Sequence, residues 1–283
     1  MTPLILGFSE FTTMPWSFDR DLAAYVAAGA QAMEVVEDKL DRHRFAEQLA
    51  AIGEAGLAIS GVQPSVRTFF ASRMTPEPRR LEDRVAALRG SIERLGPHAH
   101  GAPFITNTGA HPAGDMDEAM RVVARELNAL APVAADHGVR LALEPLNPTS
   151  VNVESAIWTV DQALTVIEDA GADEVGLCLD YWNVWQTADV AAQIARAADR
   201  IVTVQASGWR APRSFADRIA PGDGPMPLAA LMKATREAGF EGEYVVEIFS
   251  NDVADSLYDG DLDALLTRSR SGMEAAWAGS FAR

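Results

Sequence analysis

Four polar residues stand at or near the ends of short apolar runs in the second half of the chain: Glu144, Asp180, Gln205 and Glu247. Three of them are carboxylates, which repel one another strongly at close range unless a cation neutralises them. Oxygen ligands without cysteine or an evident histidine suit a hard or borderline divalent cation, Mn²⁺ first, with Mg²⁺ or Co²⁺ as alternatives. Taken singly, each could equally be a solvated strand-end group. Taken together, they predict a site for one divalent metal ion.

The elements that must position these residues recur as eight pairs of an apolar run and a helical stretch. We expect strands at 4–8, 32–37, 57–63, 102–107, 140–144, 174–180, 201–205 and 244–248. We expect helices at about 19–29, 43–55, 79–95, 115–137, 155–170, 187–199, 227–239 and 255–278. Eight such units predict an α/β fold, a single (β/α)8 TIM barrel formed by one domain over residues 1–283. An open doubly wound sheet is the alternative, but no glycine-rich phosphate motif follows the first strand.

Alternation along the expected strands brings the four polar residues to one place. Glu144 shares a strand face with Ala142, and Asp180 shares one with Cys178, while larger aliphatic residues take the opposite faces. Catalytic residues of such barrels come from the carboxyl ends of the strands. We therefore expect these polar side chains to converge at the barrel mouth.

Composition narrows the classes of function. The chain has 24 Lys and Arg against 40 Asp and Glu, a net charge of −16, which argues against a nucleic-acid partner. The single cysteine, Cys178, forms no internal disulfide and is compatible with a reducing cytoplasm. We see no signal peptide and no apolar run of about 20 residues, so we expect no membrane span and a cytoplasmic location. No interface signature is evident, and a homo-oligomer stays open.

Five segments carry a resemblance to a known family: LALEPLNP (141–148), VGLCLDYWNVW (175–185), IVTVQASGWR (201–210), DRIAPGDG (217–224) and EYVVEIFS (243–250). They resemble the xylose-isomerase-like sugar phosphate isomerases and epimerases over nearly the whole chain. The resemblance implies that Glu144, Asp180, Gln205 and Glu247 bind one divalent metal ion. It also implies a sugar or keto-sugar substrate. The family includes epimerases, isomerases and some dehydratases, so the substrate stays undefined.

The function we predict is a metal-dependent sugar isomerase or epimerase. In the family that the chain resembles, the residues corresponding to Glu144 and Glu247 move a proton alpha to a carbonyl, and a metal-stabilised enediolate is the expected intermediate. Proton transfer on both faces gives an epimer, and transfer between two carbons gives an aldose–ketose isomer.

Two other functions use the same barrel. One is a lyase that dehydrates a keto-cyclitol or a 3-dehydroshikimate-like acid at the same metal site. Many family members carry a histidine at the position of Asn183, and asparagine cannot shuttle a proton near neutral pH. The lyase would therefore need another acid, for which His111 is the candidate. The other function is non-catalytic sugar binding. An abasic-site endonuclease is excluded because the chain has only five histidines and a charge of −16.

Contacts with the substrate are expected from six further residues: Arg218, Asn183, His111, Glu34, Trp182 and Trp209. Arg218 could bind hydroxyls or an anionic group, or it could fasten its loop together with Asp217. The two tryptophans could exclude water from a reactive enediolate, or they could serve ordinary packing. The segment 69–78 is a candidate lid or subunit contact.

Overall fold

The computed structural model describes residues 2–282 and contains a closed barrel of eight parallel strands. Each strand pairs with the next along the chain, and the last strand closes on the first through the pair Leu6 and Tyr244. The strands are β1 (Leu6–Ser9), β2 (Ala32–Val36), β3 (Ala58–Gln63), β4 (Phe104–Thr106), β5 (Leu141–Leu143), β6 (Val175–Asp180), β7 (Ile201–Ala206) and β8 (Tyr244–Val246). The prediction of a (β/α)8 TIM barrel is confirmed.

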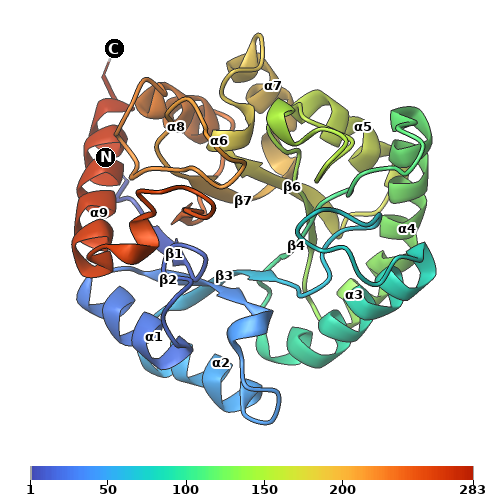
Figure 1. Cartoon of the computed structure of the whole chain (residues 1–283), viewed down its shortest axis with the longest axis horizontal. Coiled ribbons are helices and arrows are strands. Elements are labelled where there is room, and N and C mark those ends of the chain that lie inside the picture. The colour runs from blue at the N-terminus through green and yellow to red at the C-terminus, as the bar shows by residue number, and fades with distance from the viewer. Residues whose placement is uncertain (1, 283) are drawn as a thin grey trace.

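Helices form a ring around the strands, as Figure 1 shows in a view down the barrel. They are α1 (Phe18–Ala27), α2 (Phe45–Glu54), α3 (Leu81–Leu95), α4 (Met116–Asp136), α5 (Val160–Ala170), α6 (Tyr181–Val184), α7 (Val190–Ala197), α8 (Leu228–Glu237) and α9 (Leu262–Gly279). Among the described residues, no helix has the length and apolar character required to cross a membrane.

Two predicted helices begin too early, and local capping explains both differences. The helix expected at 155–170 starts at Val160 because Thr159 and Gln162 form a reciprocal capping box. The helix expected at 255–278 starts at Leu262, where the Asp261 side chain accepts a hydrogen bond from a backbone N–H. The short helix α6 was not predicted; the Asp180 carboxylate caps it.

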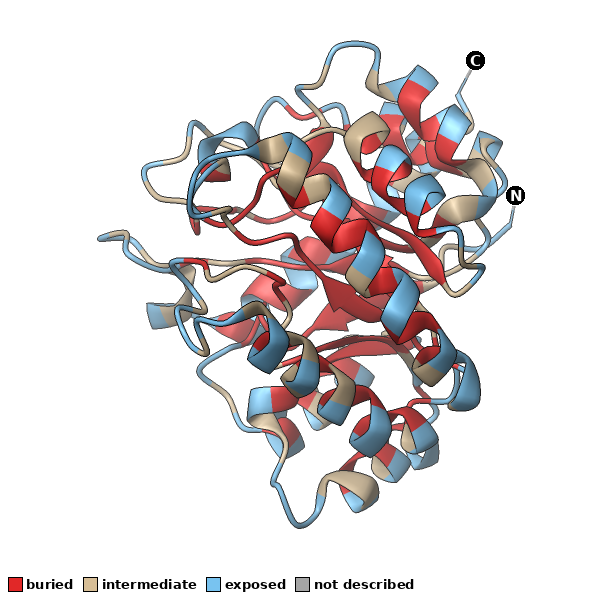
Figure 2. Ribbon diagram, turned by 90° about the vertical axis from the view of Figure 1, so that its right-hand side faces the viewer, coloured by how far each residue is buried: buried red, intermediate tan, exposed pale blue. Residues whose placement is uncertain are grey.

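The core has two layers that follow the alternation along the strands. The large side chains of Leu141 and Leu143 join the main core between barrel and helices, whereas Ala142 lies inside the barrel with Ile105 and Cys178. Figure 2 shows the buried strands at the centre of the molecule and helices whose outer faces are exposed. Two residues further along the same strand faces, the polar residues Asn107, Glu144 and Asp180 stand at the carboxyl end of the barrel.

The loop after β3 is fixed against the end of β4. The N–H of Asn107 donates to the carbonyl of Arg67 at 2.8 Å, and the N–H of Phe70 donates to the carbonyl of Thr108 at 2.9 Å. Gly109 permits this approach, because it has φ of +74° and a Cβ atom there would lie 2.0 Å from the Phe70 carbonyl oxygen. The start of this loop therefore continues the strand pairing beyond the barrel.

Arg84 on α3 holds the rest of the same loop. Its side chain is buried, and its guanidinium donates to the carbonyls of Thr68 at 2.7 Å, Pro78 at 2.6 Å and Thr75 at 3.1 Å. A fourth hydrogen bond reaches the Thr68 hydroxyl. One side chain thus joins the two ends of the segment 69–78 to a helix.

Replacing Arg84 tests this interpretation of the loop. We expect Arg84→Met to lower the free energy of unfolding by about 2–3 kcal/mol, because it leaves buried carbonyl groups without donors. Limited proteolysis should then cut the segment 69–78 faster than in the wild type. Arg80→Met, at the exposed start of the same helix, is the matched control and should leave both readouts almost unchanged. Equal effects from the two variants would contradict the assignment.

Candidate functional site

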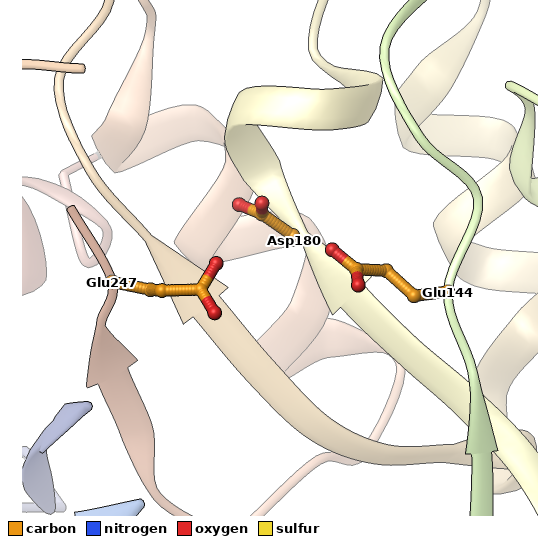
Figure 3. Close-up of side chains that lie close together, drawn as sticks. All are labelled: Glu144, Asp180 and Glu247. Carbon is orange, nitrogen blue, oxygen red and sulfur yellow. The ribbon is translucent and has the colours of Figure 1, made fainter. Parts of the chain in front are cut away.

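Three carboxylates converge at the carboxyl end of the barrel. Glu144 directly follows β5, Asp180 is the last residue of β6, and Glu247 directly follows β8. Each offers an oxygen atom, and these oxygens all lie within 4.8 Å of one another. Figure 3 shows the three side chains pointing toward one another from separate strands. All three residues are buried.

Gln205 and Glu34 lie next to this cluster, inside the barrel. The Gln205 amide nitrogen donates to Glu247 at 3.0 Å and to Glu34 at 2.8 Å. The amide oxygen of Gln205 faces away and accepts a hydrogen bond from the Cys178 thiol at 3.3 Å. A half-turn of the amide is therefore needed before its oxygen can act as a metal ligand.

Two amide side chains at the site were missed by the sequence analysis. Gln63, the last residue of β3, donates to Glu247 at 3.1 Å and to Glu34 at 3.2 Å. Asn107, which follows β4, donates to Glu144 at 2.8 Å. Both stand at strand ends, so the rule that found the carboxylates would have found them as well.

Asn183 joins two of the carboxylates to each other. Its amide nitrogen donates to Glu144 and to Asp180, each at 2.8 Å. Its amide oxygen accepts a hydrogen bond from the N–H of Asn147 at 2.9 Å, which fixes the orientation of the side chain. Asparagine therefore orients the two carboxylates without carrying a charge of its own.

Arg218 supplies the positive charge that pairs with the cluster. Its guanidinium lies 2.8 Å from Asp180 and 2.9 Å from Glu247, and it is almost fully buried. The rings of Trp182 and Phe249 lie 4.9 Å and 5.0 Å from its central carbon. Ion pairs and aromatic faces together hold the guanidinium at the edge of the carboxylates.

Burial governs the protonation of these carboxylates. It raises the pKa of Glu144 to about 7, with a smaller contribution from Asp180, against the lowering effects of Asn107, Arg218 and Arg67. Burial likewise raises the pKa of Asp180 and lifts that of Glu247 well above its usual value, while Arg218 opposes both shifts. The site is thus short of positive charge.

A divalent cation fits this arrangement. Within residues 2–282, one guanidinium pairs with these three buried carboxylates, so they require further neutralisation, either by protons or by a cation. The available ligand atoms are carboxylate oxygens and, after the half-turn, the amide oxygen of Gln205. Such oxygen donors suit Mn²⁺ or Mg²⁺.

A pocket opens onto two of the three carboxylates. Glu144 and Glu247 line it, whereas Asp180 and Gln205 do not. Met74 from the loop after β3 and Phe215 from the loop after β7 also line it. The two residues predicted to move protons are therefore the ones of the cluster that face the pocket.

Residues 22–268 of the chain match the sequence model of a protein family described as the xylose isomerase-like TIM barrel. The chain belongs to the xylose isomerase-like TIM-barrel family. It is 24% identical over 254 residues to the inosose isomerase of Bacillus velezensis, and this alignment covers 86% of the chain and 88% of that relative.

Solved structures share the same fold. The IolI protein with a bound zinc atom has a TM-score of 0.82 at 19% identity, covering 99% of this chain and 100% of that one. An L-ribulose 3-epimerase has a TM-score of 0.75 at 23% identity, covering 97% and 96%. At such identities these likenesses establish the barrel alone.

Six residues were expected to contact the substrate of this xylose isomerase-like protein. Three of them line the pocket: Arg218, Asn183 and Trp182. The pocket leaves out the other three: His111, Trp209 and Glu34. Contact of these three residues with a substrate therefore stays a prediction that the lining of this pocket does not support.

Each of the three has another partner. The ring nitrogen Nδ1 of His111 accepts hydrogen bonds from two backbone N–H groups of its own loop, at 3.2 and 3.3 Å. The ring of Trp209 packs edge-to-face on Trp185 with 5.1 Å between the centroids. Glu34 is fully buried behind the amides of Gln63 and Gln205.

The loop that carries Arg218 is fastened by Asp217. This buried carboxylate accepts hydrogen bonds from the side chains of Arg210 and Arg213, each at 2.8 Å. Asp255 pairs with the same two arginines from the exposed side. Burial raises the pKa of Asp217, but the hydrogen bonds from Arg213 and Arg210 outweigh it and hold the pKa well below its usual value.

The lowered pKa predicts how stability depends on pH. The ionised form of Asp217 stabilises the fold above its unfolded pKa of about 3.9, and this contribution disappears as the pH falls through the lower folded pKa. We expect Asp217→Asn to lower the free energy of unfolding by about 2 kcal/mol at pH 7. The difference from the wild type should shrink below about pH 4.

Urea unfolding at several pH values measures this effect. Asp255→Asn, which removes the exposed acid from the same arginines, is the matched control and should change stability less. A difference between Asp217→Asn and the wild type that stays constant from pH 7 to pH 3 would contradict the role of the ionised carboxylate.

Proposed function

We propose that this chain is a divalent-metal-dependent isomerase or epimerase of a sugar or keto-sugar. The observation that supports it best is that Glu144 and Glu247 come from separate strands, meet beside Asp180 and both line one pocket. The relatives named inosose isomerase and L-ribulose 3-epimerase support the same class of reaction.

The metal ligands in this proposal are Glu144, Asp180, Gln205 and Glu247. Mn²⁺ is the preferred ion because the ligand atoms are oxygens, and Mg²⁺ and Co²⁺ are alternatives. The zinc atom of the IolI structure makes zinc a further ion to test. When bound, the ion would polarise a carbonyl and so make the adjacent C–H more acidic.

Two carboxylates move the proton in this proposal. Glu144, oriented by the amides of Asn107 and Asn183, removes a proton from the carbon next to the carbonyl. Glu247, oriented by Gln63 and Arg218, returns a proton on the other face. Transfer across both faces gives an epimer, whereas transfer between adjacent carbons by one carboxylate gives an isomer.

The walls of the pocket protect the enediolate that proton removal leaves on the substrate. Trp182 and Phe249 line the pocket beside Glu247, and both rings also contact the Arg218 guanidinium. Apolar walls keep water away from a reactive carbanion equivalent. Arg218 lies at the same wall, where its guanidinium pairs with Asp180 and Glu247, and it would turn N–H groups toward the oxygens of the substrate once a bound cation shares these carboxylates.

A dehydratase is less well supported than an isomerase or epimerase. Among residues 2–282, no histidine lines the pocket, and the candidate acid His111 is engaged by its own loop. Asn183 cannot supply a proton near neutral pH. A lyase would therefore have to protonate the departing hydroxyl with one of the two glutamates that also take the α-proton.

Metal binding is tested by thermal unfolding of the metal-stripped protein. With Mn²⁺ at about 100 times its dissociation constant, the added stability is about 2.7 kcal/mol, or roughly 4–5 °C in melting temperature for a chain of this length. Glu247→Gln should abolish most of this shift. Glu241→Gln, an exposed acid just before the same strand, is the matched control and should retain it. A full shift in Glu247→Gln would sink the proposed ligand set.

Proton transfer is tested by solvent exchange. In D₂O with saturating Mn²⁺, the wild type should introduce deuterium at the carbon next to the carbonyl of an inosose or a ketose. Glu144→Gln should slow this exchange at least about 100-fold, because general acid–base catalysis contributes that much. NMR of the product then separates epimer from isomer. Unchanged exchange in Glu144→Gln, or none in the wild type, would contradict the proposal.

A further inference from the structure

A second guanidinium lines the pocket, and in the part of the chain that the structure describes no carboxylate pairs with it. Arg67 lies in the loop after β3 and faces the same pocket as Glu144 and Glu247. Among residues 2–282, its guanidinium forms no ion pair within 4.0 Å and donates no hydrogen bond. Arg218, by contrast, spends its donors on Asp180 and Glu247. The charge of Arg67 is therefore available to whatever enters the pocket.

The backbone of Arg67 is held in place. Its carbonyl accepts a hydrogen bond from the N–H of Asn107 at 2.8 Å, and the next residue, Thr68, forms a bridge to the same asparagine. Arg84 then fixes Thr68 from the other side. A side chain that starts from such a fixed point loses less freedom when it binds a ligand.

An aromatic pair supports the side chain. The guanidinium carbon of Arg67 lies 5.2 Å from the centroid of the Phe11 ring. Phe11 packs on Phe249 with 4.6 Å between the ring centroids, and Phe249 contacts Arg218. A guanidinium that rests on an aromatic face keeps the N–H groups at its edge for planar, two-point hydrogen bonding.

The carboxylate of Glu154, which also lines the pocket, does not pair with Arg67. Both carboxylate oxygens of Glu154 accept hydrogen bonds from the backbone N–H of Met74, at 3.0 and 3.2 Å. Glu144 is engaged by Asn107 and Asn183 instead. No protein carboxylate thus takes the position that a ligand would occupy beside Arg67 in the described chain.

We propose that Arg67 selects substrates that carry an oxyanion, a carboxylate or a phosphate ester, on the part of the substrate that faces the loop after β3. A neutral hydroxyl offers one acceptor atom, whereas either oxyanion offers two in the spacing of the guanidinium fork. Arg67 is a specificity-determining residue for the proposed isomerase or epimerase. The inference rests on that proposed function for the position of the reacting carbons.

Three related polyols test this selection without turnover. D-glucitol, D-gluconate and D-glucitol 6-phosphate share one carbon chain and differ in the charged group. Calorimetric titration into the Mn²⁺-loaded full chain should show at least one of the two anions binding about tenfold or more tighter than D-glucitol. The anion that binds more tightly than D-glucitol shows whether Arg67 prefers a carboxylate or a phosphate ester.

Variants assign the preference to Arg67. Arg67→Met should bring the favoured anion to within about twofold of D-glucitol and leave the Mn²⁺ shift in melting temperature intact. Arg67→Gln, which replaces the charge with a neutral polar side chain, should have the same effect. Agreement between the two variants excludes misfolding of Arg67→Met as the cause. Arg42→Met, at an exposed arginine away from the pocket, is the matched control and should keep the preference.

The outcomes separate this inference from the proposed function. It is overturned if neither anion binds the wild type more tightly than D-glucitol, or if both Arg67 variants keep the preference. It is also overturned if they weaken all three polyols equally. Loss of deuterium exchange with the anion preference intact would contradict the proposed function instead.

Discussion

Four buried carboxylates share the mouth of the barrel, and their mutual repulsion is the constraint on which the rest of the site depends. They belong to Glu34, Glu144, Asp180 and Glu247. Within the described residues, Arg218 is the one cation that forms ion pairs with them. Buried like charges are costly unless donors, protons or a cation offset them. Neutral amides supply the donors: Gln63, Asn107, Asn183 and Gln205. They orient the carboxylates without cancelling their charge, and the charge that remains is what favours a divalent cation.

The sequence predicted the barrel and the convergence of the carboxylates for one physical reason. Alternation along a strand is a local property, so the aliphatic face and the polar end of β5 or β6 can be recognised without tertiary information. The same rule applies to the runs that end at Gln63 and Asn107. These two were passed over because the alternation was followed only along the last four strands, whereas Gln63 and Asn107 stand at the ends of β3 and β4, where each amide donates to a carboxylate of the site.

Residues beyond the strand ends follow no such rule. His111 and Trp209 stand close to strand ends in sequence, yet their loops direct them to backbone N–H groups and to Trp185. Arg84 lies on an outer helix, and only the folded structure shows that its guanidinium holds the loop that carries Arg67. The direction in which a loop side chain points is decided by contacts between segments that are distant in the sequence. A pattern within the loop segment itself does not contain this information.

Arg218 illustrates how the electrostatics of the site and its binding of substrate are connected. In the structure its ion pairs with Asp180 and Glu247 partly neutralise the cluster. A cation that shares these carboxylates weakens the attraction they exert on the guanidinium, because the same negative charge cannot be neutralised twice. Contacts that do not depend on that charge remain: the rings of Trp182 and Phe249, and the carbonyl of Glu247, which accepts a hydrogen bond from Arg218 at 3.2 Å. We therefore expect a metal-bound site to keep Arg218 in place while releasing its N–H groups toward the substrate. The aromatic wall is then part of the electrostatic design, since it fixes a positive charge where the carboxylates alone no longer would.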